Sequence, residues 1–419
     1  MKRRDAIKNV VITSALGAVG QMLPKNLMAL DTQQQNRTRE GKTIAPRAIT
    51  MWDFSWLERR WPGAGYEDWD LALDELLERG YNAVRIDAFP QLVSENPEKT
   101  WTLNEVWNVQ DWGSPDVIQV QVQPLLNQFI AKCRDRDIKV GLSTWFRRDV
   151  DMTLMKIDSA AKMAEIWIKT LKTIGDANLL DAILYVDLCN EWPGDIWCPF
   201  FTNDPPEQTF GYWQTDKSMK FMKESIELVR AAYPELPLCY SFTGGQPSLY
   251  GEKDLSFFNL IEHHCWIAQL NDSEYSKAVG YNYERFSPVG YKNLAKNSER
   301  VYLEKKEYWH KLLRDEIAVI ANSAKKANQP LITTECWGIV DFKDWPGLNW
   351  EIVKEMCAVG VKAAAETGQW IAIATSNFAG PQFVGMWRDI DYHRKLTDLI
   401  KSSAIQPDLI EKNICKRLI

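Results

Sequence analysis

The sequence contains few of the residues from which metal and redox sites are built. Its 419 residues include only four His and eight Cys, and neither a Cys-x-x-Cys pair nor a His-Glu-x-x-His motif occurs. Zinc centres of the usual spacing are therefore excluded, and we expect neither a metal nor another cofactor. Several cysteines lie in apolar segments, where this residue type behaves as a small buried hydrophobe, and their spacing does not support a disulfide framework.

The sequence also lacks runs of basic residues. With 50 Lys and Arg against 56 Asp and Glu, the formal net charge is −6 and the isoelectric point is near 5.5. This balance argues against nucleic acid as a partner. Hydrophobic residues (45%) and charged residues (25%) are as frequent as in an ordinary globular protein. No feature indicates a subunit interface, so we expect a monomer.

The first 30 residues resemble an export signal. Arg3 and Arg4 precede an apolar stretch from Val10 to about Leu30, which is the order found in twin-arginine leaders. Polar residues and glycines interrupt that stretch, so a membrane span is not expected. We predict an export signal over residues 1–30, a polar linker over 31–46, and a periplasmic or extracellular protein. The alternative is a cytoplasmic protein with a basic first helix.

From residue 47 onward, short apolar runs alternate with segments of helical periodicity. Trp69, Ala72, Leu73, Leu76 and Leu77, for example, have the spacing of one buried helix face. The expected strands are 48–54, 83–86, 139–144, 182–188, 238–242, 260–266, 331–334 and 370–375. Expected helices include 117–134, 157–175, 217–233, 302–327, 350–366 and 391–403.

Eight such β–α units predict an α/β fold, a closed (β/α)8 TIM barrel over residues 47–403, followed by a tail over 404–419. A doubly wound open sheet is the alternative, and it predicts a glycine-rich phosphate turn after the first strand. The segment Gly63-Ala64-Gly65 lacks the third glycine of such a turn. The barrel is therefore favoured.

Aromatic residues are abundant, with 19 Trp, 14 Tyr and 15 Phe. Each can pack in a core or stack on the apolar face of a sugar ring. Many lie in long segments after strands 2, 4, 6 and 7, which a barrel places at its carboxyl-terminal face, where active sites of this fold lie. They include Trp101, Trp107, Trp112, Trp197, Phe201, Tyr212, Trp213, Tyr275, Tyr281, Tyr283, Trp345 and Trp350.

Two glutamates end apolar strands in short, distinctive contexts. Strand 4 ends in Asn190-Glu191, and strand 7 ends in Thr334-Glu335. In a barrel both carboxylates reach the mouth and can converge, at about 5 Å for a double displacement at a sugar. A single strand-end Glu is more often part of a salt bridge. Two at matching positions favour catalysis, in which one acid stays protonated and the other is ionised.

The ordered motifs resemble those of the clan of retaining glycoside hydrolases with (β/α)8 barrels, in particular the cellulase-like family 5 group. By this resemblance Glu191 is the acid/base and Glu335 the nucleophile. Asn190 would bind the sugar hydroxyl next to the reacting carbon, and Arg85 on strand 2 would hold the nucleophile ionised. For Arg85 the alternative is a structural ion pair with Asp87 or Asp53.

Some positions depart from the family pattern. The strand 6 segment around His264 and Trp266 is similar to His-x-Tyr, but Trp266 has no hydroxyl, so the contact to the nucleophile would come from Tyr281 or Tyr283. His263 is the alternative for the aligned histidine. Strand 3 ends without the family's His, and strand 8 ends without its sugar-platform Trp. The remaining expected substrate-binding residues are Trp52, Asp53, Trp145, His264, Trp266, Trp337 and Asn377.

The expected function is that of a retaining glycoside hydrolase acting on β-linked oligo- or polysaccharides. A carbohydrate-binding barrel that no longer catalyses is the main alternative, because of the departures after strands 6 and 8. A metal-dependent barrel enzyme is a weaker one, since His310 and His393 fall in expected helices. The sugar and its linkage do not follow from the sequence, and the long loops favour exo over endo action only slightly.

Overall fold

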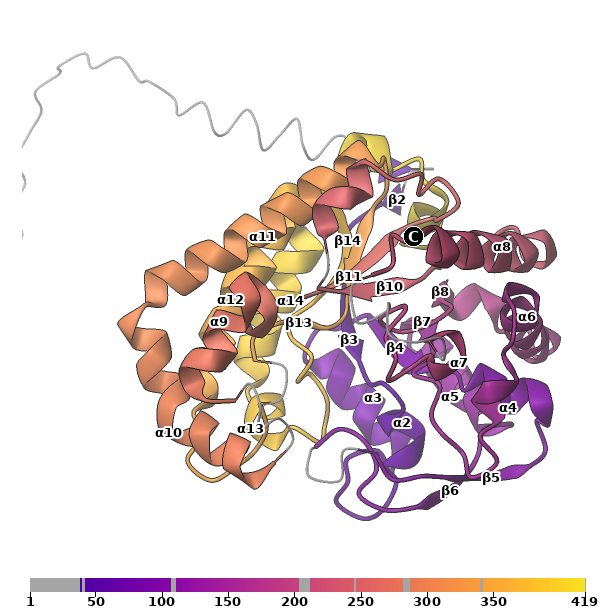
Figure 1. Ribbon diagram of the computed structural model, residues 1–419, viewed down its shortest axis with the longest axis horizontal. Coiled ribbons are helices and arrows are strands. Elements are labelled where there is room, and N and C mark those ends of the chain that lie inside the picture. Colours follow the sequence, from indigo (N-terminus) through magenta and orange to yellow (C-terminus); the bar gives the residue numbers. More distant parts are fainter. Residues whose placement is uncertain are drawn as a thin grey trace, which may run out of the picture. The chain divides into compact units, whose positions relative to one another are not determined.

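Parallel strands form the centre of the computed structural model (Figure 1). Their order in the sheet is β10-β11-β12-β14-β3-β4-β7-β8-β9. Because β9 and β10 are consecutive pieces of one chain segment, interrupted only at Tyr240, the sheet closes on itself. The predicted (β/α)8 barrel is confirmed. Its strands are β3 (Arg47–Met51), β4 (Ala83–Asp87), β7 (Lys139–Ser143), β8 (Ile183–Asp187), β9 (Leu238–Cys239), β10 (Ser241–Thr243), β11 (Ile261–Trp266), β12 (Leu331–Thr333) and β14 (Trp370–Ala374).

The structure describes residues 38–39, 42–106, 111–202, 212–244, 246–281, 287–339 and 342–418. The barrel belongs to the compact unit Arg37–Ile419, and residues 1–36 are a separate unit. The predicted export signal, most of the predicted linker, Trp107 and Tyr283 lie outside the described residues.

The barrel strands are buried along their length. In β3, β4, β8 and β14 every residue is buried, and helices cover the outside of the sheet. Parallel strands covered in this way need near-continuous apolar sequences, as in Ile183–Asp187 and Trp370–Ala374. Polar residues inside such strands, Arg85 and Glu262 among them, are therefore exceptions that need partners.

Amphipathic helices follow the strands (Figure 1). The longer ones are α3 (Trp69–Glu78), α5 (Leu125–Arg134), α6 (Ala160–Asp176), α8 (Asp216–Ala232), α10 (Pro288–Glu304), α11 (Lys306–Lys326), α12 (Trp350–Thr367) and α14 (Ile390–Ser402). The shorter ones are α2 (Ser55–Glu58), α4 (Pro90–Glu95), α7 (Pro199–Thr202), α9 (Leu270–Val279) and α13 (Val384–Trp387). Side chains of Asp68, Ser159 and Thr215 cap α3, α6 and α8 by accepting backbone N–H bonds.

Two expected helices differ from the structure. The first half of 117–134 is the strand β6 (Ile118–Gln121), which pairs antiparallel with β5 (Thr100–Leu103). Its apolar residues alternate with glutamines, a period of two that outweighs the helical pattern. The expected helix 302–327 corresponds to α11, and its first three residues belong instead to the end of α10, which precedes α11 and is separated from it at Lys305.

The C-terminal segment packs against the amino-terminal ends of barrel strands. It contains two short 3₁₀ helices, Pro407–Leu409 and Asn413–Leu418. The Arg47 guanidinium donates to the carbonyl of Leu418 at 3.0 Å, and Arg417 donates to the carbonyl of Ile183 at 2.6 Å. Of the remaining described strands, β1 (Thr38–Arg39) and β2 (Lys42–Thr43) form a short hairpin, and β13 (Cys336–Trp337) pairs with β11.

All eight cysteines are buried and free. Within the described ranges, none of the helices combines the length and the apolar character needed to cross a membrane.

Candidate active site

Glu191 and Glu335 converge at the carboxyl ends of the barrel strands. A carboxylate oxygen of each lies within 4.8 Å of the other and of Nδ1 of His264. Glu191 follows β8 with a left-handed backbone (φ +48°), which is uncommon outside glycine, and its N–H donates to the Ser241 hydroxyl at 2.9 Å. Glu335 follows β12, and its carbonyl accepts from the N–H of Cys265 on β11. Backbone bonds to neighbouring strands thus fix both residues.

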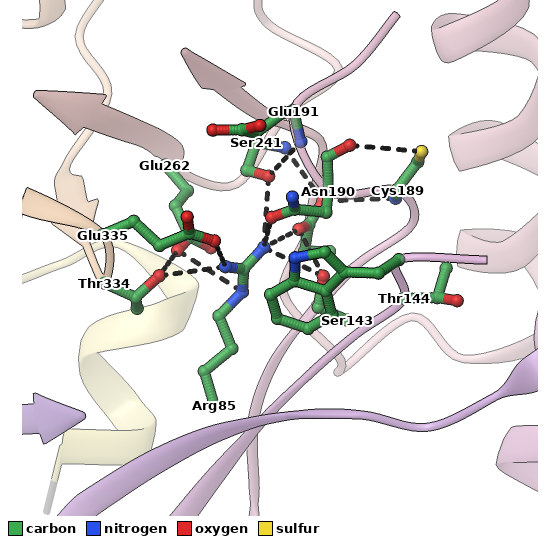
Figure 2. A network of polar contacts seen from close by, with 12 residues as sticks. Arg85, Ser143, Thr144, Cys189, Asn190, Glu191, Ser241, Glu262, Thr334 and Glu335 are labelled. Carbon is green, nitrogen blue, oxygen red and sulfur yellow. Dashed lines mark hydrogen bonds and ion pairs between the residues drawn. The ribbon is translucent and has the colours of Figure 1, made fainter. Parts of the chain in front are cut away.

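The guanidinium of Arg85, from β4, joins the ends of several strands (Figure 2). Its Nη1 donates to Oε1 of Glu335 and to the Thr334 hydroxyl, both at 3.1 Å. Its Nη2 donates to Asp187 at 2.6 Å and to Asn190 at 2.7 Å. Further acceptors of Nη2 are the hydroxyls of Ser143 and Ser241. Arg85 therefore orients Glu335 and Asn190 together.

Arg85 is fully buried and faces carboxylates from three neighbouring segments of the barrel. They are Asp187 at 2.6 Å, Glu335 at 3.1 Å and Glu262 at 3.5 Å. Burial alone would lower the pKa of Arg85, but the charges of Glu262 and Asp187 raise it well above its ordinary value. The alternative of an ion pair with Asp87 or Asp53 is not what the structure shows.

His264, from β11, lies between acidic groups. Its Nδ1 lies 3.0 Å from Glu191 and 3.8 Å from Glu335, and its Nε2 lies 3.7 Å from Glu262. His263 points elsewhere, because its ring bonds to the hydroxyl of Tyr250. His264 is therefore the histidine of the site.

Burial and mutual charge shift the pKa values of this cluster. Burial raises the pKa of Glu335 to about 7, and the charges of Glu191 and Glu262 add to the shift. Burial alone would lower the pKa of His264, but Glu335, Glu191 and Glu262 raise it to about 10. Burial alone would raise the pKa of Glu191. The hydrogen bond and the charge of His264, together with hydrogen bonds from Trp197 and Thr243, outweigh that effect, and the net shift is downward. One proton is thus held on His264, beside Glu191.

The expected residues Asn190, Trp145, Trp266 and Asn377 also lie at this end of the barrel. Trp145 stacks on the Arg85 guanidinium at 4.5 Å. Nδ2 of Asn190, Nε1 of Trp266 and both amide atoms of Asn377 are buried and have no partner among the described residues. Buried polar atoms normally have partners, so these atoms are candidates to meet sugar hydroxyls or bound water.

Other expected binding residues are packed in the interior. Trp52 and Trp337 are fully buried, and their indole N–H groups donate to the carbonyls of Ala379 and Ala374. Asp53 is buried and accepts from the N–H of Ser55. Tyr281, expected as a possible hydroxyl donor to the nucleophile, is buried and packs on the ring of Tyr291.

Several residues of the site were not among the sequence candidates. Glu262, Asp187, Ser143 and Ser241 contact Arg85. The indole N–H of Trp197, which the sequence placed only among the aromatic residues of this face, donates to Glu191 at 3.2 Å. Glu262 could have been found from strand periodicity. It lies two residues before His264 on one strand, and residues two apart share a face.

A cavity of about 180 Å³ lies on the Glu191 side of the site. Trp197, which bonds to Glu191, and Trp145, which stacks on Arg85, both line it together with Phe146. Arg148 and Glu105 contribute charged groups to its wall. Aromatic faces combined with charged groups suit a sugar ring with its hydroxyls.

Glu191, His264 and Glu335 carry donor atoms of the kinds that metal ions bind, within 4.8 Å of one another. The contact between Nδ1 of His264 and Glu191, at 3.0 Å, is a hydrogen bond, and Arg85 already pairs with Glu335. We therefore interpret the cluster as a set of proton-exchanging groups.

Comparison with known proteins gives a family assignment. The profile of the sugar-binding cellulase-like family matches residues 49–401. A crystal structure from Parabacteroides distasonis ATCC 8503, whose naming as a glycoside hydrolase is itself provisional, shares 57% identity, has a TM-score of 0.87, and covers 90% of this chain and 99% of that chain. No curated protein matches the chain.

Two further solved structures match the chain at low identity. A glycoside hydrolase family 5, subfamily 18 protein from Streptomyces cattleya in complex with GlcNAc has 10% identity and a TM-score of 0.47, covering 87% of this chain and 83% of that chain. A family 5 xyloglucan-specific β-1,4-glucanase from a ruminal metagenomic library has 13% identity and a TM-score of 0.48, covering 85% and 95%. With the family profile spanning nearly the whole barrel, the chain belongs to the sugar-binding cellulase-like family.

Proposed function

We propose that the protein is a retaining glycoside hydrolase of β-linked oligo- or polysaccharides. The observation that carries the proposal is the separation of less than 4.8 Å between carboxylate oxygens of Glu191 and Glu335. Retaining enzymes hold their carboxyl groups about 5–5.5 Å apart, whereas inverting enzymes need about 6.5–9.5 Å to admit a water. The short separation therefore favours double displacement.

In the proposed mechanism Glu335 is the nucleophile. Its carboxylate attacks the anomeric carbon while Glu191 gives a proton to the leaving oxygen, and a glycosyl–enzyme ester forms. Water then attacks the ester and loses a proton to Glu191, which restores both residues. The hydrogen bond from Arg85 keeps Glu335 oriented, and Nδ2 of Asn190 is available to the neighbouring sugar hydroxyl.

The cavity beside Trp197 suits the leaving-group side of the substrate. Its wall includes the residue that donates to Glu191, so a sugar held there would have its glycosidic oxygen near the acid. Trp145 and Phe146 offer aromatic faces, and Arg148 and Glu105 can bond to hydroxyls. We propose that this cavity receives the leaving-group sugar.

The decisive experiment compares the wild type with Glu335→Gln on nitrophenyl β-glucoside, β-galactoside, β-mannoside and β-xyloside. We expect hydrolysis with retained anomeric configuration by NMR in the wild type, and a loss of at least about 10³-fold in kcat/KM in the variant, because no nucleophile remains. Glu252→Gln, the same change at an exposed glutamate, is the matched control and should be fully active. Unchanged hydrolysis by Glu335→Gln contradicts the proposal.

The role of Glu191 has its own test. Glu191→Ala should lose most activity on substrates with poor leaving groups, and added azide should restore turnover of an activated aryl glycoside and give the β-glycosyl azide. The small anion attacks the ester without needing a base, so this product identifies the acid/base residue. A variant that azide does not rescue would argue against this role.

A non-catalytic sugar-binding protein is the second candidate. It is favoured by Trp266 and Asn377, which stand where the resembled family has a Tyr and a Trp. Sugar binding by calorimetry without any hydrolysis over the same substrate panel would support it. Loss of hydrolysis on adding EDTA would instead point to metal-assisted chemistry.

We also propose that the protein is exported and monomeric. The paired Arg3 and Arg4 ahead of the apolar stretch support export. Fractionation of cells expressing the full chain, with an Arg3→Lys, Arg4→Lys variant as control, tests export. Size-exclusion chromatography with light scattering tests the oligomeric state.

A further inference from the structure

Glu262 is a third glutamate in the centre of the barrel, and the proposed mechanism does not use it. It lies on β11, two residues before His264, and is fully buried. The Thr334 hydroxyl donates to its Oε1, which also lies 3.5 Å from Nε of Arg85 and 3.7 Å from Nε2 of His264. Figure 2 shows it beside Thr334 and Arg85.

Burying a carboxylate at this position lowers the stability of the fold, so we expect Glu262 to serve a function. Four acids, Asp187, Glu191, Glu262 and Glu335, surround two cationic groups, Arg85 and His264. Asp187 already pairs with Arg85 at 2.6 Å, so Arg85 does not require a further acid. What Glu262 adds is a negative charge on the far side of the His264 ring from Glu191.

The two ring nitrogens of His264 face different carboxylates. Nδ1 faces Glu191 at 3.0 Å, and Nε2 faces Glu262 at 3.7 Å. A neutral imidazole carries one N–H, and the partner of one nitrogen decides which tautomer forms. At 3.7 Å the two atoms are too far apart for a hydrogen bond, and Nε2 of His264 has no hydrogen-bond partner among the described residues. The negative charge of Glu262 beside Nε2 nevertheless favours the proton on Nε2 and leaves Nδ1 to share a proton with Glu191.

We propose that Glu262 is a positioning residue that fixes the tautomer of His264, so that Nδ1 of His264 exchanges with Glu191 the proton that the leaving group receives. The inference rests on the proposed function. It explains why the proton resides on His264 and not on the neighbouring Glu191.

The proton transfer balances over one turnover. The N–H bond at Nδ1 of His264 breaks and an O–H bond forms on Oε1 of Glu191, which converts an imidazolium and a carboxylate into two neutral groups. Glu191 then gives this proton to the glycosidic oxygen. In the second half of the reaction Glu191 takes a proton from the attacking water and returns it to Nδ1. Nε2 keeps its proton toward Glu262 throughout.

The charged and titratable groups around His264 come from several neighbouring segments of the barrel. Arg85 on β4 contacts Glu262 and Glu335, Asp187 on β8 contacts Arg85, and Glu191 and Glu335 face Nδ1. His263, next in sequence, bonds to Tyr250. Among the described residues, Glu262 is the acid that contacts Nε2.

The first experiment uses leaving groups of different acidity. Glu262→Gln keeps the side-chain volume and removes the charge. On an alkyl or sugar leaving group, which needs a proton, we expect kcat/KM to fall about 10–100-fold, as for residues that orient a functional histidine. A 2,4-dinitrophenyl glycoside releases 2,4-dinitrophenolate, which departs without being protonated. For this substrate we expect kcat/KM to change by no more than about threefold. The alkaline limb of the pH profile should move to lower pH.

Asp187→Asn is the matched control, because Asp187 contacts Arg85 and not His264. It should slow both leaving groups by similar factors, since Arg85 acts through the nucleophile. If Glu262→Gln also slows both equally, or changes neither, the inference is wrong. If the wild type hydrolyses none of the glycosides, it is the proposed function that fails.

The second experiment does not depend on a variant that folds. Labelling the wild type with ¹⁵N-histidine gives four imidazoles, and three of them bond to tyrosine hydroxyls. We expect His264 to remain protonated at Nε2 when it titrates to the neutral form. A neutral His264 that carries its proton on Nδ1 would overturn the inference, whether or not the protein is active.

Discussion

At the scale of single residues, Arg85 is the buried cation that pairs with several buried carboxylates. It contacts Asp187, Glu262 and Glu335, and all of these side chains are buried. Removing one partner of a buried ion pair leaves an uncompensated charge, which costs far more than the loss of an exposed pair. Arg85 therefore links stability to the orientation of the nucleophile.

Arg85→Lys should be strongly destabilising although it keeps the charge. A lysine ammonium cannot donate at once to the acceptors of Nη1 and Nη2, so some carboxylates lose their partner. We expect a loss of about 3–5 kcal/mol in the free energy of unfolding, larger at pH 8 than at pH 5 because the acids are then ionised. Urea unfolding at both pH values measures it.

Arg136→Lys is the control for that variant. Arg136 also contacts two acids, Asp70 at 2.9 Å and Asp74 at 2.7 Å, but at the surface. Exposed pairs contribute about 0–1 kcal/mol, so this variant should change stability little. Equal losses in the two variants would contradict the role given to Arg85.

The pH dependence of activity follows from the same cluster. The pKa of Glu335 is raised to about 7, and a nucleophile must be ionised, so kcat/KM should rise by about tenfold per pH unit up to about pH 7. The pKa of His264 is raised to about 10. Above that pH His264 has lost the proton that it passes to Glu191, so kcat/KM should fall near pH 10. Initial rates from pH 5 to 11 on an alkyl glycoside test this, and a maximum near pH 5 would refute it.

The sequence was sufficient to predict the proximity of residues that lie at defined positions along the barrel strands. Asn190, Glu191, Glu335 and Arg85 stand where barrel geometry makes them converge, so their proximity could be predicted. The burial of Trp52 could not, because a tryptophan after a strand can face either the core or a ligand. Glu262 was missed although its spacing of two residues from His264 puts both side chains on one face of the strand. Its contacts with Arg85 and Thr334 depend on the packing of the barrel and do not follow from that spacing.

At the scale of elements, strands were predictable because each is an apolar run between turn residues. The bounds of β4 and β7 differ from the prediction by a single residue at one end. Errors arose where two patterns compete, as in 117–134, or where a helix breaks without proline or glycine, as at Lys305. The break depends on tertiary packing, which periodicity does not contain.

The pairing of β7 with β8 depends on a glycine. Gly141 lies opposite Tyr185, and a Cβ on Gly141 would meet the Tyr185 ring at 2.6 Å. The ring is fully buried and has no room to move aside. Gly141→Ala should therefore lower the free energy of unfolding by about 1–3 kcal/mol, as overpacking does, in urea titrations.

Gly175→Ala supplies the comparison. Gly175 lies near the end of α6, and its Cβ would meet only the tip of Leu180 at 3.2 Å. Alanine is favoured over glycine in helices by about 0.5–1 kcal/mol, so this variant should be neutral or more stable. A loss at Gly175 as large as that at Gly141 would mean that contact with Tyr185 is not the cause.

At the scale of the whole molecule, the two ends of the barrel differ in charge. The carboxyl ends of the strands hold the buried acids Asp53, Asp87, Asp187 and Glu335, and Glu262 lies inside the barrel near the start of β11. The amino ends are packed by the C-terminal segment through contacts such as that of Arg47 with Leu418. The buried charges at the carboxyl end destabilise the fold, and packing in the rest of the barrel offsets this loss. Such local destabilisation is common at functional sites.

The buried acids also make stability depend on pH. Burial raises the pKa values of Asp53, Asp87 and Glu335 to about 7. A group whose pKa is raised in the folded state contributes stability below its unfolded pKa and loses it as the pH rises through the folded value. Between pH 4 and 7 each of these acids should therefore make the protein less stable as the pH increases.

Asp53→Asn isolates one of these contributions. Asn keeps an oxygen to accept the Ser55 N–H and tolerates the left-handed backbone at this position (φ +39°). The shift from 3.8 to about 7 corresponds to at most about 4 kcal/mol, so the variant should match the wild type near pH 4 and be more stable at pH 8. Asp254 makes the same contact to Ser256 at the surface, and its pKa is lowered, so Asp254→Asn should bring no gain at pH 8. Denaturation midpoints of the variant and the wild type at pH 4 and pH 8 test this prediction. If the gain of Asp53→Asn over the wild type is no larger at pH 8 than at pH 4, ionisation of Asp53 does not destabilise the folded protein.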